Sequence, residues 1–180
     1  MRLPLSSFAV FFLGLSACFG SVGSESLPEP AVHRSESITC DNVRDSPPVN
    51  MREEDFCTSH EDCTEGANGR CLPNRFGNSC TYDGCFEDSE CGGPCVCGVG
   101  SGANFCTGGG CQVDADCGPG GWCSPTLGSC GNLGGVVAFE CHTSRDECTD
   151  DSDCSDLANG YCTFAAEVGH WVCGNSQCEG

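Results

Sequence analysis

The chain has 180 residues, of which 21 are cysteines and 26 are glycines, and it carries a formal net charge of −19 with seven arginines and no lysine. A chain with about 12% cysteine and few large apolar residues cannot bury a large hydrophobic core, so disulfides have to hold it together. The lack of lysine excludes Schiff-base chemistry, and the surplus of acidic groups argues against nucleic acid as a partner, because phosphate binding needs basic side chains.

The first residues have the pattern of an export signal. The apolar run Phe8–Leu15 follows a positively charged start and is too short to cross a bilayer, which takes ~20 apolar residues. The run ends in the sequence LSAC at 15–18, which resembles the lipobox of bacterial lipoproteins. The resemblance implies a signal peptide over 1–17 and a lipid anchor on Cys18, at the outer membrane or cell surface of a bacterium. The alternative is ordinary cleavage close to Cys18, which gives a secreted protein.

Residues 18–39 combine the anchor cysteine with a segment rich in serine, proline and acidic residues. Such a composition buries too little surface to offset the entropy of ordering, which predicts a flexible acidic tether. Cys40 then marks the start of the folded part. Setting Cys18 aside leaves 20 of the 21 cysteines, an even number that can pair completely.

The segment 40–180 repeats one cysteine pattern four times. Two cysteines separated by five residues open each copy, and the residue before the second of them is acidic: Asp62, Glu90, Asp116 and Asp153. Two positions earlier stands a second acid in three copies, Asp88, Asp114 and Asp151, and His60 in the first copy. A third and a fourth cysteine follow. The pattern predicts an array of four units at 57–84, 85–110, 111–147 and 148–180.

We expect every cysteine after Cys18 to be part of a disulfide. These cysteines are Cys40, Cys57, Cys63, Cys71, Cys80, Cys85, Cys91, Cys95, Cys97, Cys106, Cys111, Cys117, Cys123, Cys130, Cys141, Cys148, Cys154, Cys162, Cys173 and Cys178. Spacing does not fix the connectivity. Our hypothesis pairs the first cysteine of a unit with the third and the second with the fourth, taking Cys97 as third in the second unit and Cys130 as fourth in the third. Cys40, Cys95, Cys141 and Cys178 then remain for two further bridges.

The expected fold class is small and disulfide-rich, with tandem cysteine-rich repeats, short β-hairpins and little helix. Asn-Gly at 68–69 and 159–160 and Pro-Gly-Gly at 119–121 indicate tight turns. The apolar runs 136–139 and 170–172 are strand candidates, and no helical period of useful length is present in the sequence.

The segment 111–130, C-QVDAD-C-GPGGW-C-SPTLGS-C, resembles the start of the Dickkopf N-terminal cysteine-rich motif, which shares the acidic residue before the second cysteine and a Gly-Pro-Gly turn. The likeness covers about 20 residues well and the other copies loosely. The whole chain is similar to the cysteine-rich, lysine-poor lipoproteins of myxobacteria. These resemblances imply a fold and no functional residues, and the bacterial type of anchor argues against the Wnt antagonism of Dickkopf proteins.

Calcium is the one cofactor candidate. Asp150, Asp151 and Asp153 crowd around Cys154, and calcium takes about six to eight oxygen ligands. The competing interpretation is structural, because an aspartate just before a cysteine can accept backbone N–H bonds and start a turn. No two cysteines have the two-residue separation typical of zinc sites, so we expect neither zinc nor an iron–sulfur cluster.

The sequence predicts no enzyme. It contains no G-x-S-x-G, no H-E-x-x-H and no P-loop, and complete pairing of the cysteines leaves no thiolate nucleophile. Outside the tether, which contains His33, we expect the histidines His60, His142 and His170 to lie at the surface.

Two functions remain open. The first is a lipid-anchored extracytoplasmic binding or structural module that presents an acidic face to an unknown envelope or extracellular protein. The second is a secreted inhibitor-like or signalling effector, in which an exposed loop, Pro73–Asn78 with Arg75, inserts into a target. The expected partners are therefore a membrane, through the anchor, and a protein.

Overall fold

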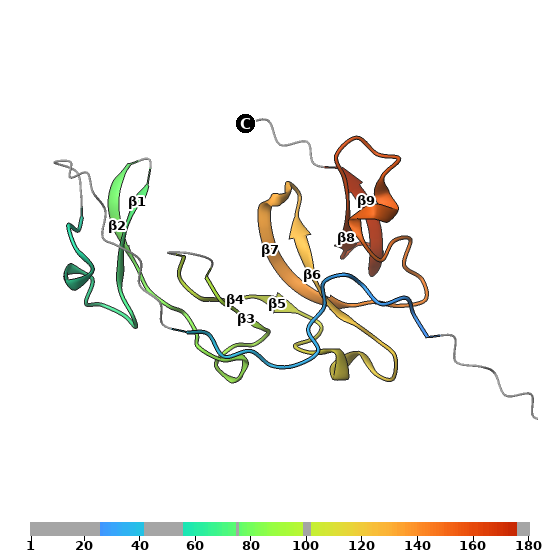
Figure 1. The fold of residues 1–180 in the computed structure, drawn as a ribbon, viewed down its shortest axis with the longest axis horizontal. Coiled ribbons are helices and arrows are strands. Elements are labelled where there is room, and N and C mark those ends of the chain that lie inside the picture. Colours follow the sequence, from blue (N-terminus) through green and yellow to red (C-terminus); the bar gives the residue numbers. More distant parts are fainter. Residues whose placement is uncertain (1–25, 42–55, 75, 99–101, 176–180) are drawn as a thin grey trace, which may run out of the picture.

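The computed structural model describes residues 26–41, 56–74, 76–98 and 102–175, and it contains four similar units in a row (Figure 1). Each unit has a 3-10 helix followed by an antiparallel pair of strands. The elements are η1 (His60–Asp62), β1 (Arg70–Asn74), β2 (Gly77–Thr81), η2 (Asp88–Glu90), β3 (Cys95–Val96), β4 (Phe105–Cys106), β5 (Gly108–Gly109), η3 (Asp114–Cys117), β6 (Cys123–Gly128), β7 (Gly131–Cys141), η4 (Asp151–Cys154), β8 (Gly160–Ala165) and β9 (His170–Asn175). These described ranges contain no α-helix. The predicted fold class is confirmed.

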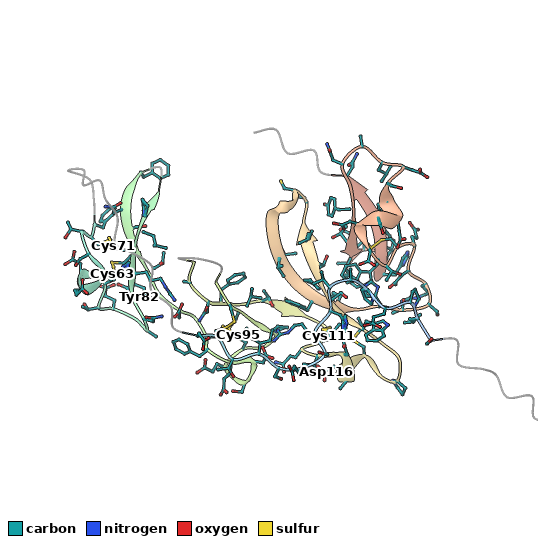
Figure 2. The ribbon with its side chains drawn as sticks, viewed as in Figure 1. Cys63, Cys71, Tyr82, Cys95, Cys111 and Asp116 are labelled. Atoms are coloured by element: carbon teal, nitrogen blue, oxygen red, sulfur yellow. A yellow bond between two sulfur atoms is a disulfide. The ribbon has the colours of Figure 1, made fainter. Side chains whose placement is uncertain are left out.

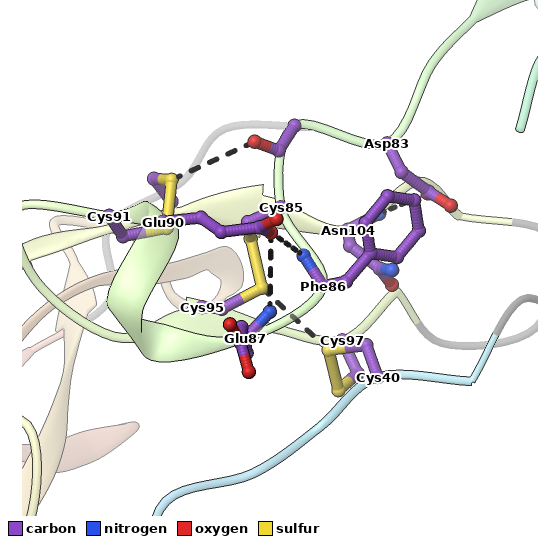
Figure 3. Close-up of a disulfide and its surroundings, with 12 residues drawn as sticks. Cys40, Asp83, Cys85, Phe86, Glu87, Glu90, Cys91, Cys95, Cys97 and Asn104 are labelled. Atoms are coloured by element: carbon purple, nitrogen blue, oxygen red, sulfur yellow. Dashed lines mark hydrogen bonds between the residues drawn. A yellow bond between two sulfur atoms is a disulfide. The ribbon is translucent and has the colours of Figure 1, made fainter. Parts of the chain in front are cut away.

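The acidic residue before the second cysteine of each unit is the third residue of the 3-10 helix, and its side chain caps the beginning of that helix. Its carboxylate accepts hydrogen bonds from two backbone N–H groups at the beginning of the helix, where backbone donors lack helical partners. The donors are Thr58 and Ser59 to Asp62, Phe86 and Glu87 to Glu90 (Figure 3), Gln112 and Val113 to Asp116, and Thr149 and Asp150 to Asp153. These backbone bonds hold the pKa of Asp62, Asp116 and Asp153 below the usual value. The structural interpretation of these acids is confirmed.

The residue two positions before this acid fixes the third cysteine of the unit. The side chains of Asp88, Asp114 and Asp151 accept hydrogen bonds from the backbone N–H groups of Cys95, Cys123 and Cys162, and Nδ1 of His60 accepts the same bond from Cys71, at distances of 2.8, 2.8, 2.9 and 3.0 Å. His60 therefore replaces the acid as an acceptor. The bond also identifies Cys95, and not Cys97, as the third cysteine of the second unit.

Nine disulfides join eighteen cysteines of the described residues. The pairs are Cys40–Cys97, Cys57–Cys71, Cys63–Cys80, Cys85–Cys95, Cys91–Cys106, Cys111–Cys123, Cys117–Cys141, Cys148–Cys162 and Cys154–Cys173. Cys130 is disulfide-bonded as well. Cys18 and Cys178 lie outside the described residues. The first and fourth units have the predicted pairing of first with third and second with fourth cysteine.

The other two units correct the predicted pairing. Cys97 was expected to pair with Cys85, but Cys95 takes that place and Cys97 bonds to Cys40 (Figure 3). Cys130 was expected to pair with Cys117, but Cys141 does. The physical reason is the strand register, because the third and fourth cysteines of every unit lie opposite each other across the hairpin. The opposed pairs are Cys71 and Cys80, Cys95 and Cys106, Cys123 and Cys141, and Cys162 and Cys173.

Cystines form most of the core of each unit (Figure 2). Cys57, Cys63 and Cys71 are buried together in the first unit with Tyr82 packed against them. Single aromatic rings complete the cores of the third and fourth units, where Phe139 and Trp171 are buried beside the disulfides. Sulfur atoms and a few rings thus take the place of an aliphatic interior.

Glycine is required two positions before the third cysteine in three units. A Cβ atom on Gly69, Gly121 or Gly160 would collide with the carbonyl oxygen of the second cysteine of the same unit. At the two predicted Asn-Gly turns, Asn68 and Asn159 have positive φ angles of 49° and 56°, a conformation that asparagine tolerates better than most residues. The predicted turns are therefore confirmed.

Neighbouring units are joined by side chains as well as by the chain. Between the first two units, the Asp83 carboxylate accepts hydrogen bonds from Arg70, Asn68 and the backbone N–H of Asn104. Burial acts to raise the pKa of Asp83, but these bonds keep it below the usual value. Between the third and fourth units, the hydroxyls of Thr126 and Thr163 are 2.9 Å apart.

The N-terminal segment 26–41, here called the strap, lies along three units (Figure 1). The backbone N–H of Ala31 donates to Asp150 in the fourth unit, Nδ1 of His33 donates to Asp114 in the third, and Arg34 bonds to Asp88 in the second. The Cys40–Cys97 disulfide closes the strap at its end. The predicted flexible tether is therefore wrong over 26–39, because acidic side chains of the repeats supply the partners that the strap's own composition lacks. Residues 18–25 lie outside the described residues.

Arg34 is the most deeply held side chain of the strap. Its Nη2 lies 3.0 and 2.9 Å from the two carboxylate oxygens of Asp88, and the exposed fractions of the two side chains are 6% and 4%. The guanidinium carbon is 5.3 Å from the centre of the Phe139 ring. Arg34 therefore connects the strap to the second unit by charge and to the third unit by a cation–π contact.

Removing this cation should destabilise the protein. Arg34→Ala leaves the buried Asp88 carboxylate without its ionic partner, so the free energy of unfolding should fall by about 3 kcal/mol. Guanidinium denaturation with the disulfides intact measures this loss, and amide hydrogen exchange should become faster across the strap. The control is Arg145→Ala, at an exposed arginine that bonds to the Gly169 carbonyl. Equal losses in the two variants would contradict the structural role of Arg34.

Candidate binding sites

The three aspartates predicted to bind calcium use their carboxylates in the fold. Asp153 accepts two backbone N–H bonds, Asp151 accepts one from Cys162, and Asp150 accepts one from Ala31 at 2.8 Å. Within the part of the chain that the structure describes, their oxygens do not gather as a set of metal ligands. Calcium at these residues stays a prediction, and the ion would have to compete with backbone N–H groups.

The closely spaced ligand atoms found among the described residues are cysteine sulfurs, with one group in each unit. The groups are Cys57, Cys63 and Cys80; Cys85, Cys91 and Cys95; Cys111, Cys117 and Cys141; and Cys148, Cys154 and Cys173. Every one of these sulfurs is disulfide-bonded. They offer no thiolate, which is the form that binds metal ions.

Two of the histidines are buried, which corrects the expectation that they lie at the surface. His60 is the acceptor for the Cys71 N–H, as described above. His142 lies at the joint of the third and fourth units, where its ring stacks on Trp171 at a centroid distance of 4.4 Å and its Nδ1 donates to Asp146 at 2.8 Å. His170 is half-buried. His60 and His142 therefore act as parts of the framework.

A pocket of about 520 Å³ opens where the strap, the third unit and the fourth unit meet. Its apolar lining includes Val32, Leu127 and Trp171, and its polar lining includes Asp150 and Asp151. Ser124 also lines the pocket, and its hydroxyl is buried with no hydrogen-bond partner. The pocket thus combines an apolar body with two carboxylates and one unused hydroxyl. Sequence reasoning missed it, since its three walls come from distant parts of the chain.

The hairpin β1–β2 carries the loop predicted to insert into a target. Arg75 lies outside the described residues, and its neighbour Phe76 has 69% of its surface exposed. Phe56 is 84% exposed, and its backbone N–H donates to the carbonyl of Asn78, which places it beside β2 close to this loop. The first unit lies at the end of the row opposite the fourth unit (Figure 1). The structure therefore presents aromatic surface at that end.

The chain matches no family model, no curated protein and no solved structure. Among the described residues, no helix has the length and apolar character needed to span a membrane. The number of disulfides indicates an extracytoplasmic or secreted protein, because reducing systems keep most cytosolic thiols free.

The buried His142 should make stability depend on pH. Burial lowers the pKa of His142, although the hydrogen bond and charge of Asp146 and the charge of Asp150 act in the opposite direction. The unfolded chain therefore binds a proton at higher pH than the folded chain does, and stability falls as the pH drops through about 6.5. Thermal melts between about pH 7.5 and 5.5 measure this decline, which should be smaller in His142→Gln. His170→Gln should keep the full decline, and identical profiles for His142→Gln and the unsubstituted protein would contradict the prediction.

Proposed function

We propose that the protein is a lipid-anchored extracytoplasmic binding module, held to a membrane through Cys18 and presenting a rigid acidic surface to a basic protein partner. The strap is the observation that carries this proposal. It contains the first described residues after the anchor cysteine, and it is bound to three of the four units. A strap of this kind would hold the units in a fixed orientation relative to the membrane.

The direction of the strap supports an arrangement at the membrane. Ala31 contacts the fourth unit, and Cys40 bonds to the second. The carbonyl of Leu27, near the start of the strap, accepts a hydrogen bond from Trp122 of the third unit. The strap therefore begins at the third and fourth units, which would lie nearest the membrane, whereas the first unit with its hairpin would point away from it (Figure 1).

The charge of the chain supports a basic partner. The chain has 26 acidic residues against seven arginines and no lysine. Several carboxylates are used within the fold, but Glu65 and Asp156 are exposed. Such a surface attracts a basic protein over a distance of about one Debye length, ~8 Å at physiological salt, and it repels anionic lipids and nucleic acids. Binding, and not catalysis, is the function we propose.

The proposed lipid anchor can be tested by the mass of the mature protein and by the cell fraction in which it is found. The protein purified from membranes should carry a diacylglyceryl group on Cys18 as its first residue, which intact-mass analysis with and without alkylation detects. Cys18→Ser should move the protein into the soluble fraction, because the acyl chains supply the membrane affinity. The disulfides should form normally in this variant. A Cys18→Ser protein that stays in the membrane fraction, or a membrane-derived protein without lipid, would contradict the anchor.

The partner can be cross-linked to this protein through its lysine amines. Because this chain has no lysine, a zero-length carbodiimide can link its carboxylates to lysine side chains of another protein but not to lysines of its own. We expect a discrete adduct on intact cells that disappears at about 1 M salt, where the Debye length is only ~3 Å.

The alternative function, an inhibitor-like effector, is favoured by the exposed Phe76 in the Pro73–Asn78 loop. It would be supported instead if no adduct formed and the protein inhibited a trypsin-like protease in a manner that Arg75→Ala abolished.

A further inference from the structure

In the second and third units, the acid two positions before the helix-capping acid makes two kinds of contact. One oxygen of Asp88 accepts the N–H of Cys95, and both oxygens bond to Arg34 of the strap. Oδ1 of Asp114 accepts the N–H of Cys123, and Oδ2 accepts a hydrogen bond from His33 of the strap at 2.7 Å. Each acid therefore fixes its own unit and also holds one nitrogen-bearing side chain from outside that unit.

In the fourth unit the corresponding acid is Asp151, and within the described ranges it bonds only to the N–H of the third cysteine. Oδ1 of Asp151 accepts the N–H of Cys162 at 2.9 Å. Among the described residues, no donor bonds to its Oδ2 and no cation pairs with it. The strap passes this unit with Ala31 and Val32, which have no side-chain donor, directly before His33 and Arg34.

In both units, the strap side chain that bonds to this acid also contacts an aromatic ring. The His33 ring contacts Trp122 edge-on at 4.8 Å between centroids, and the Arg34 guanidinium lies over Phe139. At the fourth unit the pocket provides both components, since Asp151 and Trp171 line it together. The 3% exposed Ser124 adds a hydroxyl without a hydrogen-bond partner to the same lining. The pocket, of about 520 Å³, is thus lined by the carboxylate of Asp151, the ring of Trp171 and the unpartnered hydroxyl of Ser124.

We propose that this pocket binds an arginine side chain of a partner polypeptide, with the guanidinium on Asp151 and the aliphatic stem against Val32 and Trp171. Arg34 on Asp88 is the internal precedent for this arrangement. A guanidinium is planar, weakly hydrated and able to stack on rings, so it suits the exposed carboxylate of Asp151 next to the buried Trp171 indole better than an ammonium does. The nearby Asp150 adds negative charge at the same wall. The inference rests on the proposed binding function and assigns it a site.

Titration of the full chain with defined peptides tests this site. The probes are a blocked pentapeptide, Gly-Val-Arg-Val-Gly, the same peptide with citrulline in place of arginine, and free N-acetyl-arginine amide. NMR of the isotope-labelled protein follows the Trp171 indole N–H and the Cys162 amide. We expect saturable shifts of both signals with the arginine peptide, and none with the uncharged citrulline peptide. Asp151→Asn, which keeps an oxygen for the Cys162 N–H, should weaken binding about tenfold or more.

The matched control is Asp156→Asn, which removes the same charge from an exposed acid of the same unit outside the pocket lining. It should change the dissociation constant less than about twofold. Equal weakening by the two variants would indicate diffuse attraction to the acidic surface, which overturns the pocket and leaves the proposed function intact. Failure of the arginine peptide to bind, or equal binding of the citrulline peptide, overturns the site even if Asp151→Asn does not fold. Equal affinity for the free arginine amide overturns the polypeptide as the source of the guanidinium.

Discussion

A carboxylate bonded to two backbone N–H groups begins every unit of this protein, and the rest of the unit depends on it. The bond sets the 3-10 helix, which places the second cysteine, and the residue two positions earlier then holds the N–H of the third cysteine. With both cysteines placed, the hairpin brings the fourth opposite the third. The acidic character of the chain is therefore partly a folding requirement. A unit this small cannot rely on burial of apolar side chains, so its geometry comes from directed hydrogen bonds and disulfides.

The strap joins the second, third and fourth units to one another. Each unit has its own cystine core, and a disulfide inside a unit does nothing to orient that unit against the next. His33 and Arg34 supply donors to acids of two different units, and Phe139 covers the guanidinium from a strand of the third. In a chain so poor in cations, two adjacent basic residues thus determine much of the relative placement of the second and third units.

Much of the unit could be predicted from the sequence, because its determinants are local. The acid before a cysteine, the Asn-Gly turns and the strand candidate 136–139 all act within a few residues of their own position. The errors concern relations between distant segments. Cys97 was expected to be the third cysteine of the second unit, but the N–H bond to Asp88 and the register opposite Cys106 give that position to Cys95. The strap and the pocket could not be predicted from the strap's overall composition, since both depend on contacts with distant repeats. The pair His33-Arg34 inside an acidic segment was the one available hint.

The disulfide that closes the strap has a topological effect. Cys40 and Cys97 are 57 residues apart, and the whole first unit lies within the ring of chain that they close. A protease that cuts the chain once anywhere inside this ring leaves the two fragments covalently joined. The N-terminal fragment would therefore stay attached to the remaining units after such a nick, and only reduction would break the covalent link.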